Sequence, residues 1–331
     1  MENLNNVPLK TSSVSAVITT YNRPVSLERA MKSVFAQIAM PFELVVIDNG
    51  SQLETQEVVT RLSETSPIAV RFIREETRGV SAARNRGIKE VVTDYLAFLD
   101  DDDTWASDHI SLFLEHASQF PSLVLYAGWT SRISDPEHRP DFVKPELLQE
   151  YRPDISEGLL IRKKNELTAP FYTSAMSASV VNTAQAIQHP FDQELQGRED
   201  IYFVWLLGES GDIVIHNYSH AYVDQLDISL FSLPTSASRI ERLTMDLKKA
   251  YWGVKMLEKV RDRKEMSGCP GLVAALRSAY FDYAYTKLQV REIRSAISFG
   301  LKSARLGVQV RHIKLLIRIF ITAIAAPISQ R

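Results

Sequence analysis

Short, almost uninterrupted apolar runs alternate with helix-periodic stretches over the first third of the chain. Continuous apolarity is typical of strands buried on both faces of a parallel sheet. The predicted strands cover residues 14–19, 44–47, 70–73 and 95–99, and the predicted helices between them cover 27–38, 54–64 and 80–91. In the first of these helices one face collects Leu27, Met31, Val34, Phe35 and Ile38. The pattern predicts an α/β fold with a mostly parallel sheet flanked by helices.

The pattern becomes less regular after residue 105 and purely helical near the end. A helix at 108–116 leads to a strand at 123–129, and further strands near 177–181 and 212–216 flank a helix at 197–210. The segment 131–154 is rich in proline and charge and predicts an irregular surface excursion. From about residue 236 the spacing of apolar residues predicts helices only, including 272–290 and 292–306. We expect a disordered lead-in (1–13), an α/β domain (14–232) and an α-helical C-terminal region (233–331).

Each predicted strand of the first third is followed by polar residues. Thr19, Tyr21 and Arg23 follow the first strand, Asp48 follows the second, a loop ending in Arg78 and Gly79 follows the third, and four aspartates follow the fourth. Because the carboxyl ends of parallel strands meet at one edge of a sheet, ligands collect there. We expect these four clusters to line one crevice.

The run Asp100–Asp103 concentrates negative charge directly after a buried strand. Crowded carboxylates raise one another's pKa unless cations neutralise them. Oxygen ligands without nearby His or Cys favour Mg²⁺ or Mn²⁺, whose coordination shells are commonly completed by phosphate oxygens. If the chain stays extended, Asp100 and Asp102 point to the same side. A solvated acidic turn that caps the next helix is the alternative.

The residues FLDDDDT also fit a second enzyme class. Through Asp100, Asp102 and Thr104 they match the hydrophobic-Asp-x-Asp-x-Thr pattern of haloacid-dehalogenase-like phosphohydrolases. That resemblance requires the motif to follow the first strand of its fold, whereas three strand–helix units precede it here. It also requires a further carboxylate pair, and Asp212 lacks a second carboxylate four residues on. Phosphohydrolase activity stays an alternative function for the aspartate run.

Four segments together resemble the family-two glycosyltransferases of the GT-A fold. They are VITTYNRPVSLERAMKSVFAQ, ELVVIDNGS, TRGVSAARNRGI and DYLAFLDDDDTW, in this order and at these spacings. The resemblance is strong over residues 14–105 and weaker to about residue 230. It implies a Rossmann-like nucleotide-diphospho-sugar transferase fold, with a donor-binding half at 14–105 and an acceptor and catalytic half at 106–232.

The same resemblance implies an activity. We expect an inverting, metal-dependent glycosyltransferase that moves a sugar from a nucleotide-sugar, with UDP as the favoured nucleotide, to a hydroxyl of a saccharide or lipid-linked acceptor. Cell-surface polysaccharide or glycolipid synthesis is the expected setting. A relative that binds nucleotide-sugars without catalysis is a further alternative, which intact carboxylates argue against.

Matching the family's motifs residue by residue to this sequence implies a donor site. Thr19 and Tyr21 should lie against the base and ribose, and Asp48 should accept a hydrogen bond from the base, which would suit uracil. Gly79, Arg84, Asn85 and Gly87 match the family's Gly-x-x-x-x-Arg-Asn-x-Gly stretch, whose helix start favours the donor's anionic diphosphate. The expected donor-binding residues are Thr19, Tyr21, Arg23, Asp48, Arg78, Arg84, Asp100 and Asp101.

The resemblance also assigns the metal and the catalytic base. Asp102, with Asp100, is the expected ligand of Mn²⁺ or Mg²⁺. The metal ion would act as a Lewis acid on the leaving diphosphate. In GREDIYFVWLL, Asp200 is the expected base and Glu199 binds or orients the acceptor, although acidic pairs at helix starts also occur as ordinary caps. Many family members carry a His after this helix, where Gln225 lies here. His216 and His220 either substitute for it or are ordinary structural residues.

The composition limits the kinds of partner and site that the sequence predicts. The 38 Lys and Arg balance 40 Asp and Glu, so no basic field predicts nucleic acid as a partner. The single cysteine, Cys269, excludes an intrachain disulfide and a Cys-rich zinc site. The first 13 residues lack the pattern of a signal peptide, and we expect a cytoplasmic protein.

The end of the chain predicts a basic amphipathic helix. One helical stripe carries Arg311, Lys314, Arg318 and Thr322, and the remaining surface carries Ile313, Leu316, Ile317, Phe320, Ile321 and Ile324. Such a helix can lie in a membrane interface, which would hold residues 307–331 at the inner face of the cytoplasmic membrane. Packing of the apolar face on the domain is the equally weighted alternative.

Overall fold

The computed structural model describes residues 13–132, 159–162, 176–223, 236–263 and 271–324 of the 331-residue chain. The expected lead-in and most of the proline-rich excursion lie outside these residues. The chain divides into two compact units. The first contains the described parts of Met1–Asn165, Thr173–Gln193 and Phe203–Asp227, and the second those of Glu166–Tyr172, Glu194–Tyr202 and Ile228–Arg331.

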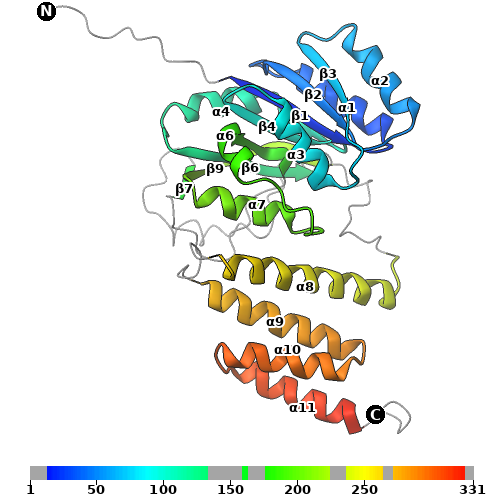
Figure 1. Cartoon of the computed structure of the whole chain (residues 1–331), viewed down its shortest axis with the longest axis vertical. Coiled ribbons are helices and arrows are strands. Elements are labelled where there is room, and N and C mark those ends of the chain that lie inside the picture. Colours follow the sequence, from blue (N-terminus) through cyan, green and yellow to red (C-terminus); the bar gives the residue numbers. More distant parts are fainter. Residues whose placement is uncertain (1–12, 133–158, 163–175, 224–235, 264–270, 325–331) are drawn as a thin grey trace, which may run out of the picture. The chain divides into compact units, whose positions relative to one another are not determined.

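A single mixed sheet organises the first unit (Figure 1). Its strands among the described residues are β1 (Val14–Thr20), β2 (Glu43–Asp48), β3 (Ala69–Arg74), β4 (Tyr95–Asp100), β5 (Asp103–Trp105), β6 (Leu123–Arg132), β7 (Leu159–Arg162), β8 (Ser179–Asn182) and β9 (Asp212–Val223). The order is β3-β2-β1-β4-β8-β6-β9-β5, with β7 also paired to β9. The four strands from β3 to β4 are parallel, whereas β8 runs antiparallel to both of its neighbours. The α/β class is thus confirmed.

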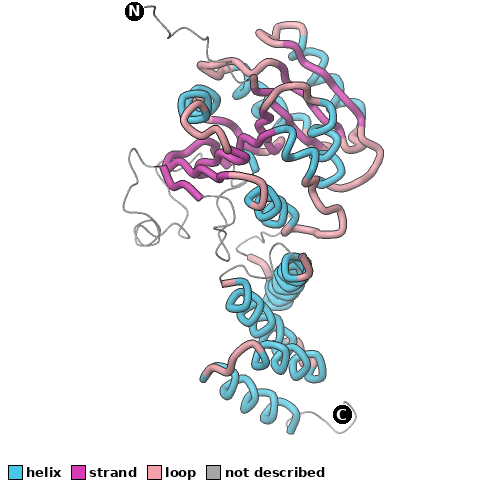
Figure 2. Tube along the Cα trace, turned by 60° about the vertical axis from the view of Figure 1, so that its left-hand side comes forward, coloured by secondary structure: helices cyan, strands magenta, loops and turns pink. Residues whose placement is uncertain are grey.

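Helices connect the strands of this unit, as Figure 2 shows. They are α1 (Pro24–Phe35), α2 (Leu53–Ser63), α3 (Val80–Glu90), α4 (His109–Ala117) and α6 (Thr183–Gln188), and α7 (Glu199–Gly208) begins in the second unit and ends in the first. Pro24 begins α1, where its missing N–H costs no hydrogen bond. The prediction for Ile38 was wrong, because α1 ends at Phe35 and Ile38 is 73% exposed.

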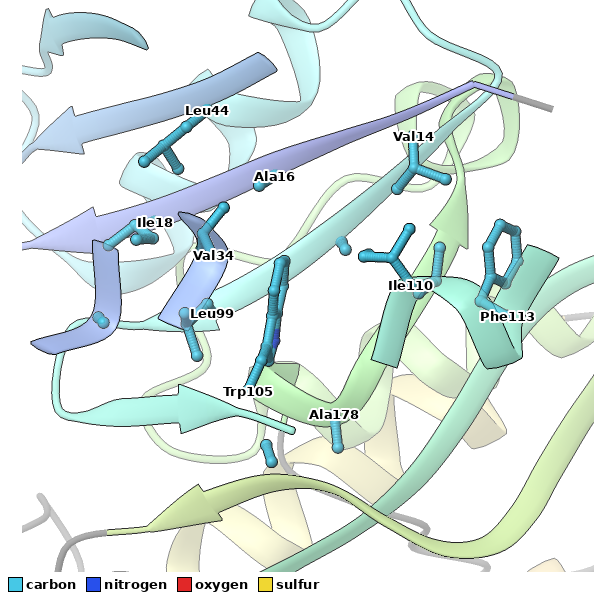
Figure 3. Close-up of a cluster of buried hydrophobic side chains, with 14 of the residues drawn as sticks. Val14, Ala16, Ile18, Val34, Leu44, Leu99, Trp105, Ile110, Phe113 and Ala178 are labelled. Atoms are coloured by element: carbon cyan, nitrogen blue, oxygen red, sulfur yellow. The ribbon is translucent and has the colours of Figure 1, made fainter. Parts of the chain in front are cut away.

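The core of the first unit forms where β1, β4 and the surrounding helices meet (Figure 3). Ile18, Leu99 and Trp105 belong to one buried cluster to which α1 and α4 also contribute. The Trp105 Nε1–H donates to the Ser177 carbonyl at 2.7 Å, which satisfies the indole's only polar group. This core fixes the strand β5, which begins at the last of the four aspartates.

The second unit is helical, as predicted. It contains α8 (Arg239–Arg261), α9 (Leu272–Gln289), α10 (Ile293–Arg305) and α11 (Val310–Ile324), and consecutive helices pack on one another. Ser238 and Glu241 form a capping box that begins α8. A separate core lies among α9, α10 and α11 and consists of Ala284, Leu288, Ala296, Leu315 and Ile319. In the described part of the chain, no helix combines the length and apolarity needed to cross a membrane.

Gly87 provides a test of how closely α3 packs on the sheet. A Cβ at this position would lie 2.4 Å from Val17 Cγ1 of β1, so Gly87→Ala overpacks the helix–strand contact. We expect the free energy of unfolding of this unit to fall by about 1–3 kcal/mol, measured by chemical denaturation. Gly253→Ala in α8 is the control, because no atom lies within 4 Å of its added Cβ. Equal stability of the two variants would contradict the close contact.

Candidate functional site

The carboxyl ends of the parallel strands meet at one edge, as the sequence predicted. In the register of the sheet, Thr20 lies beside Asp48, and Asp48 lies beside Arg74. On the other side of β1, Thr19 lies beside Asp100. The polar residues that follow the four strands are therefore brought to the same edge of the sheet.

The four aspartates follow a turn rather than an extended path. Strand β4 ends at Asp100, Asp101 and Asp102 form a turn, and β5 begins at Asp103. The alternation of an extended strand therefore does not govern the directions of Asp100 and Asp102. Each of the four carboxylates instead has its own environment and its own hydrogen-bonding partners.

Asp101 is the aspartate most closely tied to the loop after β1. Its Oδ2 accepts hydrogen bonds from the Thr20 hydroxyl at 2.7 Å and from the Tyr21 N–H at 3.3 Å, and its Oδ1 pairs with Arg23 at 3.2 Å. Burial raises its pKa to about 6, although Thr20 and Arg23 oppose that shift. Asp101 is thus primarily a buried anchor for the loop that carries Tyr21.

Asp102 and Asp100 keep more exposed carboxylates. Asp102 pairs with Arg23 and its side chain is 23% exposed, while Asp100 pairs with Arg84 at 2.8 Å and its side chain is 31% exposed. Burial, followed by the charge of Asp100, raises the pKa of Asp102. These two carboxylates are better placed than Asp101 to meet a ligand.

Ser177 holds the remaining aspartate and is a residue that the sequence did not single out. Its hydroxyl donates to Asp103 Oδ2 at 2.5 Å and accepts the Asp100 N–H at 3.1 Å. Burial raises the pKa of Asp103 well above its ordinary value. Ser177 therefore fixes both ends of the aspartate turn, from a position 74 residues beyond Asp103.

Asp48 is held inside the loop after β2. Its carboxylate accepts the Ser51 N–H at 3.0 Å and pairs with Arg74 at 3.2 Å, and the residue is 1% exposed. Arg74 comes from the end of β3 and was not singled out by the sequence either. The carboxylate predicted to meet a base thus has two partners within the protein.

Side chains also connect the loops after the first three strands. Ser51 Oγ accepts the Asn22 N–H at 2.8 Å, and Asn22 Oδ1 accepts the Gln52 N–H at 2.8 Å. Asn49 Oδ1 accepts the Gly79 N–H at 2.8 Å, and its Nδ2 donates to the Thr77 carbonyl at 2.7 Å. These contacts make the sheet edge a connected rim rather than three independent loops.

Tyr21 and Arg78 lie on the exposed part of this rim. The Arg78 guanidinium donates to the Tyr21 hydroxyl at 3.0 Å and lies 5.3 Å from the centre of its ring. Tyr21 is 44% exposed, which leaves an aromatic surface available for stacking. Thr19 is half-buried at the end of β1.

The Arg84–Asn85 pair lies inside the unit. Arg84 is 6% exposed, pairs with Asp100, and lies 5.4 Å from the centre of the Phe191 ring. Asn85 exchanges two hydrogen bonds with the Phe191 backbone, at 2.8 and 2.9 Å. This part of α3 therefore connects the segment around Phe191 to the aspartates.

The donor set fits a hard divalent cation. Carboxylate oxygens suit Mg²⁺ or Mn²⁺, and such ions often take one or two protein carboxylates together with phosphate oxygens. Asp102 and Asp100 are the partly exposed members of the cluster, with side chains that are 23% and 31% exposed. Among the described residues, no three His, Cys, Asp or Glu side chains form a ready metal cage.

Glu199 and Asp200 begin α7 in the second unit. Asp200 Oδ1 accepts the Ile201 N–H at 2.7 Å, and Glu199 Oε2 accepts the Gly197 N–H at 2.6 Å. Glu199 is 7% exposed and Asp200 is half-buried. Both carboxylates therefore take part in the helix start, as expected if the acidic pair is an ordinary cap. Their roles as catalytic base and acceptor-orienting residue remain predictions.

A buried network of aromatic rings holds His216 and His220. His109 and His220 share a hydrogen bond at 2.9 Å between their Nδ1 atoms, and His220 Nε2 lies 2.9 Å from His216 Nδ1. The Tyr126 hydroxyl joins His216 to His116 at 3.1 and 2.8 Å. Burial lowers the pKa of His109 to about 3 and that of His216 to about 4, and it holds the pKa of His220 well below its ordinary value.

Close packing keeps this network in place. His220 and His109 are fully buried, and a Cβ at Gly128 of β6 would lie 1.8 Å from His220 Cδ2. Only a residue without a side chain leaves room for the imidazole there. The surroundings of His220 support the structural interpretation of this residue rather than a catalytic substitute.

Comparison with known proteins identifies a family. The sequence model of Glycosyl transferase family 2 matches residues 15–183, just over half of the chain. A Campylobacter jejuni protein named GalNAc(5)-diNAcBac-PP-undecaprenol beta-1,3-glucosyltransferase is 30% identical over 107 residues, which cover 32% of this chain and 35% of that protein. The chain spans between 17% and 42% of the length of the curated relatives considered.

Solved structures share the fold. S. aureus TarS (residues 1–349) in complex with UDP-GlcNAc has a TM-score of 0.60 and 15% identity, covering 92% of this chain and 83% of that one. The mannosyltransferase PcManGT from Pyrobaculum calidifontis, in complex with GDP-Man and Mn²⁺, has a TM-score of 0.57 and 17% identity, covering 93% and 79%. The GT-A fold expected from the sequence is therefore confirmed.

The histidine network predicts acid sensitivity. An imidazole whose folded pKa is depressed stabilises the fold above its unfolded value of about 6.5, and this stability is lost as the pH falls toward about 3–4. His109→Asn keeps a polar partner for His220 but cannot titrate. We expect its free energy of unfolding to fall less steeply below pH 6.5, by up to about 1.4 kcal/mol per pH unit. Above pH 6.5 the free energy of unfolding of the variant and that of the wild type should change with pH in the same way, as measured by chemical denaturation at a series of pH values. The same pH dependence of the two proteins below pH 6.5 would contradict the assignment.

Proposed function

The chain belongs to glycosyl transferase family 2, and from this premise we propose that it is an inverting, metal-dependent glycosyltransferase. It would transfer a sugar from a nucleotide-sugar to a hydroxyl of a saccharide or lipid-linked acceptor. The observation that carries the proposal is the meeting of four polar strand ends at one sheet edge, with partly exposed carboxylates beside arginines. The phosphohydrolase alternative loses its basis, because β4 follows three strand–helix units of this family's fold.

The donor is proposed to bind in the half formed by residues 14–105. Tyr21, with Thr19, would receive the nucleoside, since its exposed ring offers a stacking surface. Asp48 is 1% exposed and its partner Arg74 is half-exposed, so the base would reach this carboxylate only after Arg74 moves aside. A carboxylate suits the N–H of uracil, and UDP is therefore the proposed nucleotide.

The diphosphate is proposed to lie beside the aspartates. Asp102 and Asp100 would hold Mn²⁺ or Mg²⁺, which when bound supplies Lewis-acid stabilisation of the leaving nucleoside diphosphate. Arg23 pairs with both Asp101 and Asp102, so its guanidinium already lies where a phosphate bound by these carboxylates would meet it. Arg78, exposed on the rim, and Arg84, paired with Asp100, are the further cations proposed to offset the charge of the diphosphate.

Asp200 is proposed as the base that takes the proton from the acceptor hydroxyl. Its position at the start of α7 follows the family motif, and Glu199 would orient the acceptor. Attack on the anomeric carbon through an oxocarbenium-like state, in a single displacement, inverts the configuration. A lipid-linked acceptor agrees with the name of the Campylobacter jejuni relative, and we propose polysaccharide or glycolipid synthesis at the inner membrane face as the setting.

Donor binding is tested by calorimetric titration of UDP and GDP, each with and without Mn²⁺. We expect UDP binding that requires Mn²⁺, and a loss of about tenfold or more in affinity for Asp102→Asn, because one carboxylate ligand is removed. Asp246→Asn on the exposed surface of α8 is the matched control and should bind as the wild type does. Metal-independent binding, or full affinity in Asp102→Asn, would contradict the proposed donor site.

The base is tested with Asp200→Asn, whose amide oxygen can still accept the Ile201 N–H. Because an amide cannot take the proton, we expect kcat to fall about 10²–10⁴-fold while UDP binding is unchanged. Turnover is measured as UDP released from a panel of UDP-sugars in the presence of lipid-linked and saccharide acceptors. Glu194→Gln, an exposed carboxylate in the preceding segment, is the control. Wild-type turnover in Asp200→Asn would exclude this residue as the base.

A further inference from the structure

Helix α11 has a packed face and, opposite to it, a second apolar face. The packed face is formed by His312, Leu315 and Ile319, which are 2–5% exposed. Leu315 also lies against Gly300 of α10, where a Cβ would come within 3.4 Å. The alternative that this helix packs on its own unit is thus correct for one face only.

The second apolar face remains at the surface. It consists of Ile313, Leu316, Ile317, Phe320 and Ile321, which are 53–66% exposed, and these residues are called the apolar arc. At 100° per residue they occupy one continuous side of the helix, opposite Leu315 and Ile319. Val308 and Val310, at 73% and 70% exposure, extend the apolar surface to the start of the helix. Exposed apolar residues in such a contiguous group mark an interaction surface.

Cations lie along one edge of the apolar arc. Lys314 and Arg318 are exposed and lie on the same side of the helix, one turn apart. Arg311 lies further inward, 4.6 Å from the centre of the Phe281 ring, where Asp282 partly meets its charge. The sequence of α11 contains no Asp or Glu, so its exposed surface is apolar and positive.

A groove at the edge of the apolar arc suits a phosphate headgroup. It has a volume of about 230 Å³ and is lined by Tyr285, Leu288, Gln289, Arg318, Ile321 and Thr322. Arg318 lies 5.4 Å from the centre of the Tyr285 ring and donates to its hydroxyl, which orients the guanidinium at the groove. The groove therefore places a cation and hydroxyls beside Ile321 of the apolar arc.

We propose that α11 binds the surface of an anionic bilayer, with the apolar arc in the acyl region and Arg318 and Lys314 at the lipid phosphates. A helix of 15 residues is too short to cross the roughly 30 Å hydrocarbon core, whereas an interfacial helix needs this combination of apolar and basic sides. A second copy pairing through the same face would offer no carboxylate of its own α11 to neutralise Lys314 and Arg318. This interaction is independent of sugar transfer.

The proposal is tested by sedimentation of the full chain with vesicles, without donor, acceptor or metal. Phosphatidylcholine vesicles with and without phosphatidylglycerol are compared at low and high salt. We expect binding to the anionic vesicles, and a loss of about tenfold or more for Ile317→Ser combined with Phe320→Ser, because two large apolar groups leave the acyl region. Lys314→Gln combined with Arg318→Gln should weaken binding at low salt and reduce its salt dependence.

Ile240→Ser in α8 is the matched control, because Ile240 is 77% exposed but lies outside the apolar arc. It should bind vesicles as the wild type does, and circular dichroism should show unchanged helicity in all variants. Absence of wild-type binding to anionic vesicles, or unchanged binding by the Ile317→Ser/Phe320→Ser variant, would overturn the proposal. A wild-type dimer that this variant splits, seen by sedimentation velocity, would assign the apolar arc to a second copy and overturn it as well.

Discussion

The cost of burying carboxylates at the end of β4 determines how the surrounding loops are arranged. Asp101 and Asp103 are almost completely covered, and burial raises the pKa of both. A buried carboxylate is tolerated only with hydrogen bonds and opposite charge around it. Asp101 receives them from Thr20 at the end of β1 and from Arg23 after it, and Asp103 receives a hydrogen bond from Ser177 before β8, while Arg84 of α3 pairs with the neighbouring Asp100. The aspartate turn therefore holds the sheet edge together.

The residues that neutralise the turn are also those that would meet a donor. Arg23 pairs with Asp101 and Asp102, and Arg84 pairs with Asp100. Under the proposed function both arginines would lie beside a bound diphosphate. Asp100 and Asp102 keep part of their carboxylates exposed beside these arginines. This partial exposure is the feature that connects the fold to the proposed chemistry.

Apolar continuity was enough to predict the strands, and the geometry of parallel sheets was enough to predict that their polar ends meet. Local pattern could not show the turn at Asp101–Asp102, because four identical residues carry no signal of a change in backbone direction. Ser177 and Arg74 were missed because their roles depend on contacts between segments distant in sequence. Similarly, periodicity showed that α11 is amphipathic, but which of its apolar residues are covered depends on how α9 and α10 pack against it.

The contact between Gly128 and His220 has a consequence for how related chains can vary. The imidazole occupies the space that a side chain at position 128 would need, and it also hydrogen-bonds with two other histidines. A substitution at either position alone would produce a collision or a gap with unsatisfied ring nitrogens. The two positions are therefore expected to covary during evolution, so that chains with alanine or a larger residue at 128 carry a smaller residue at 220.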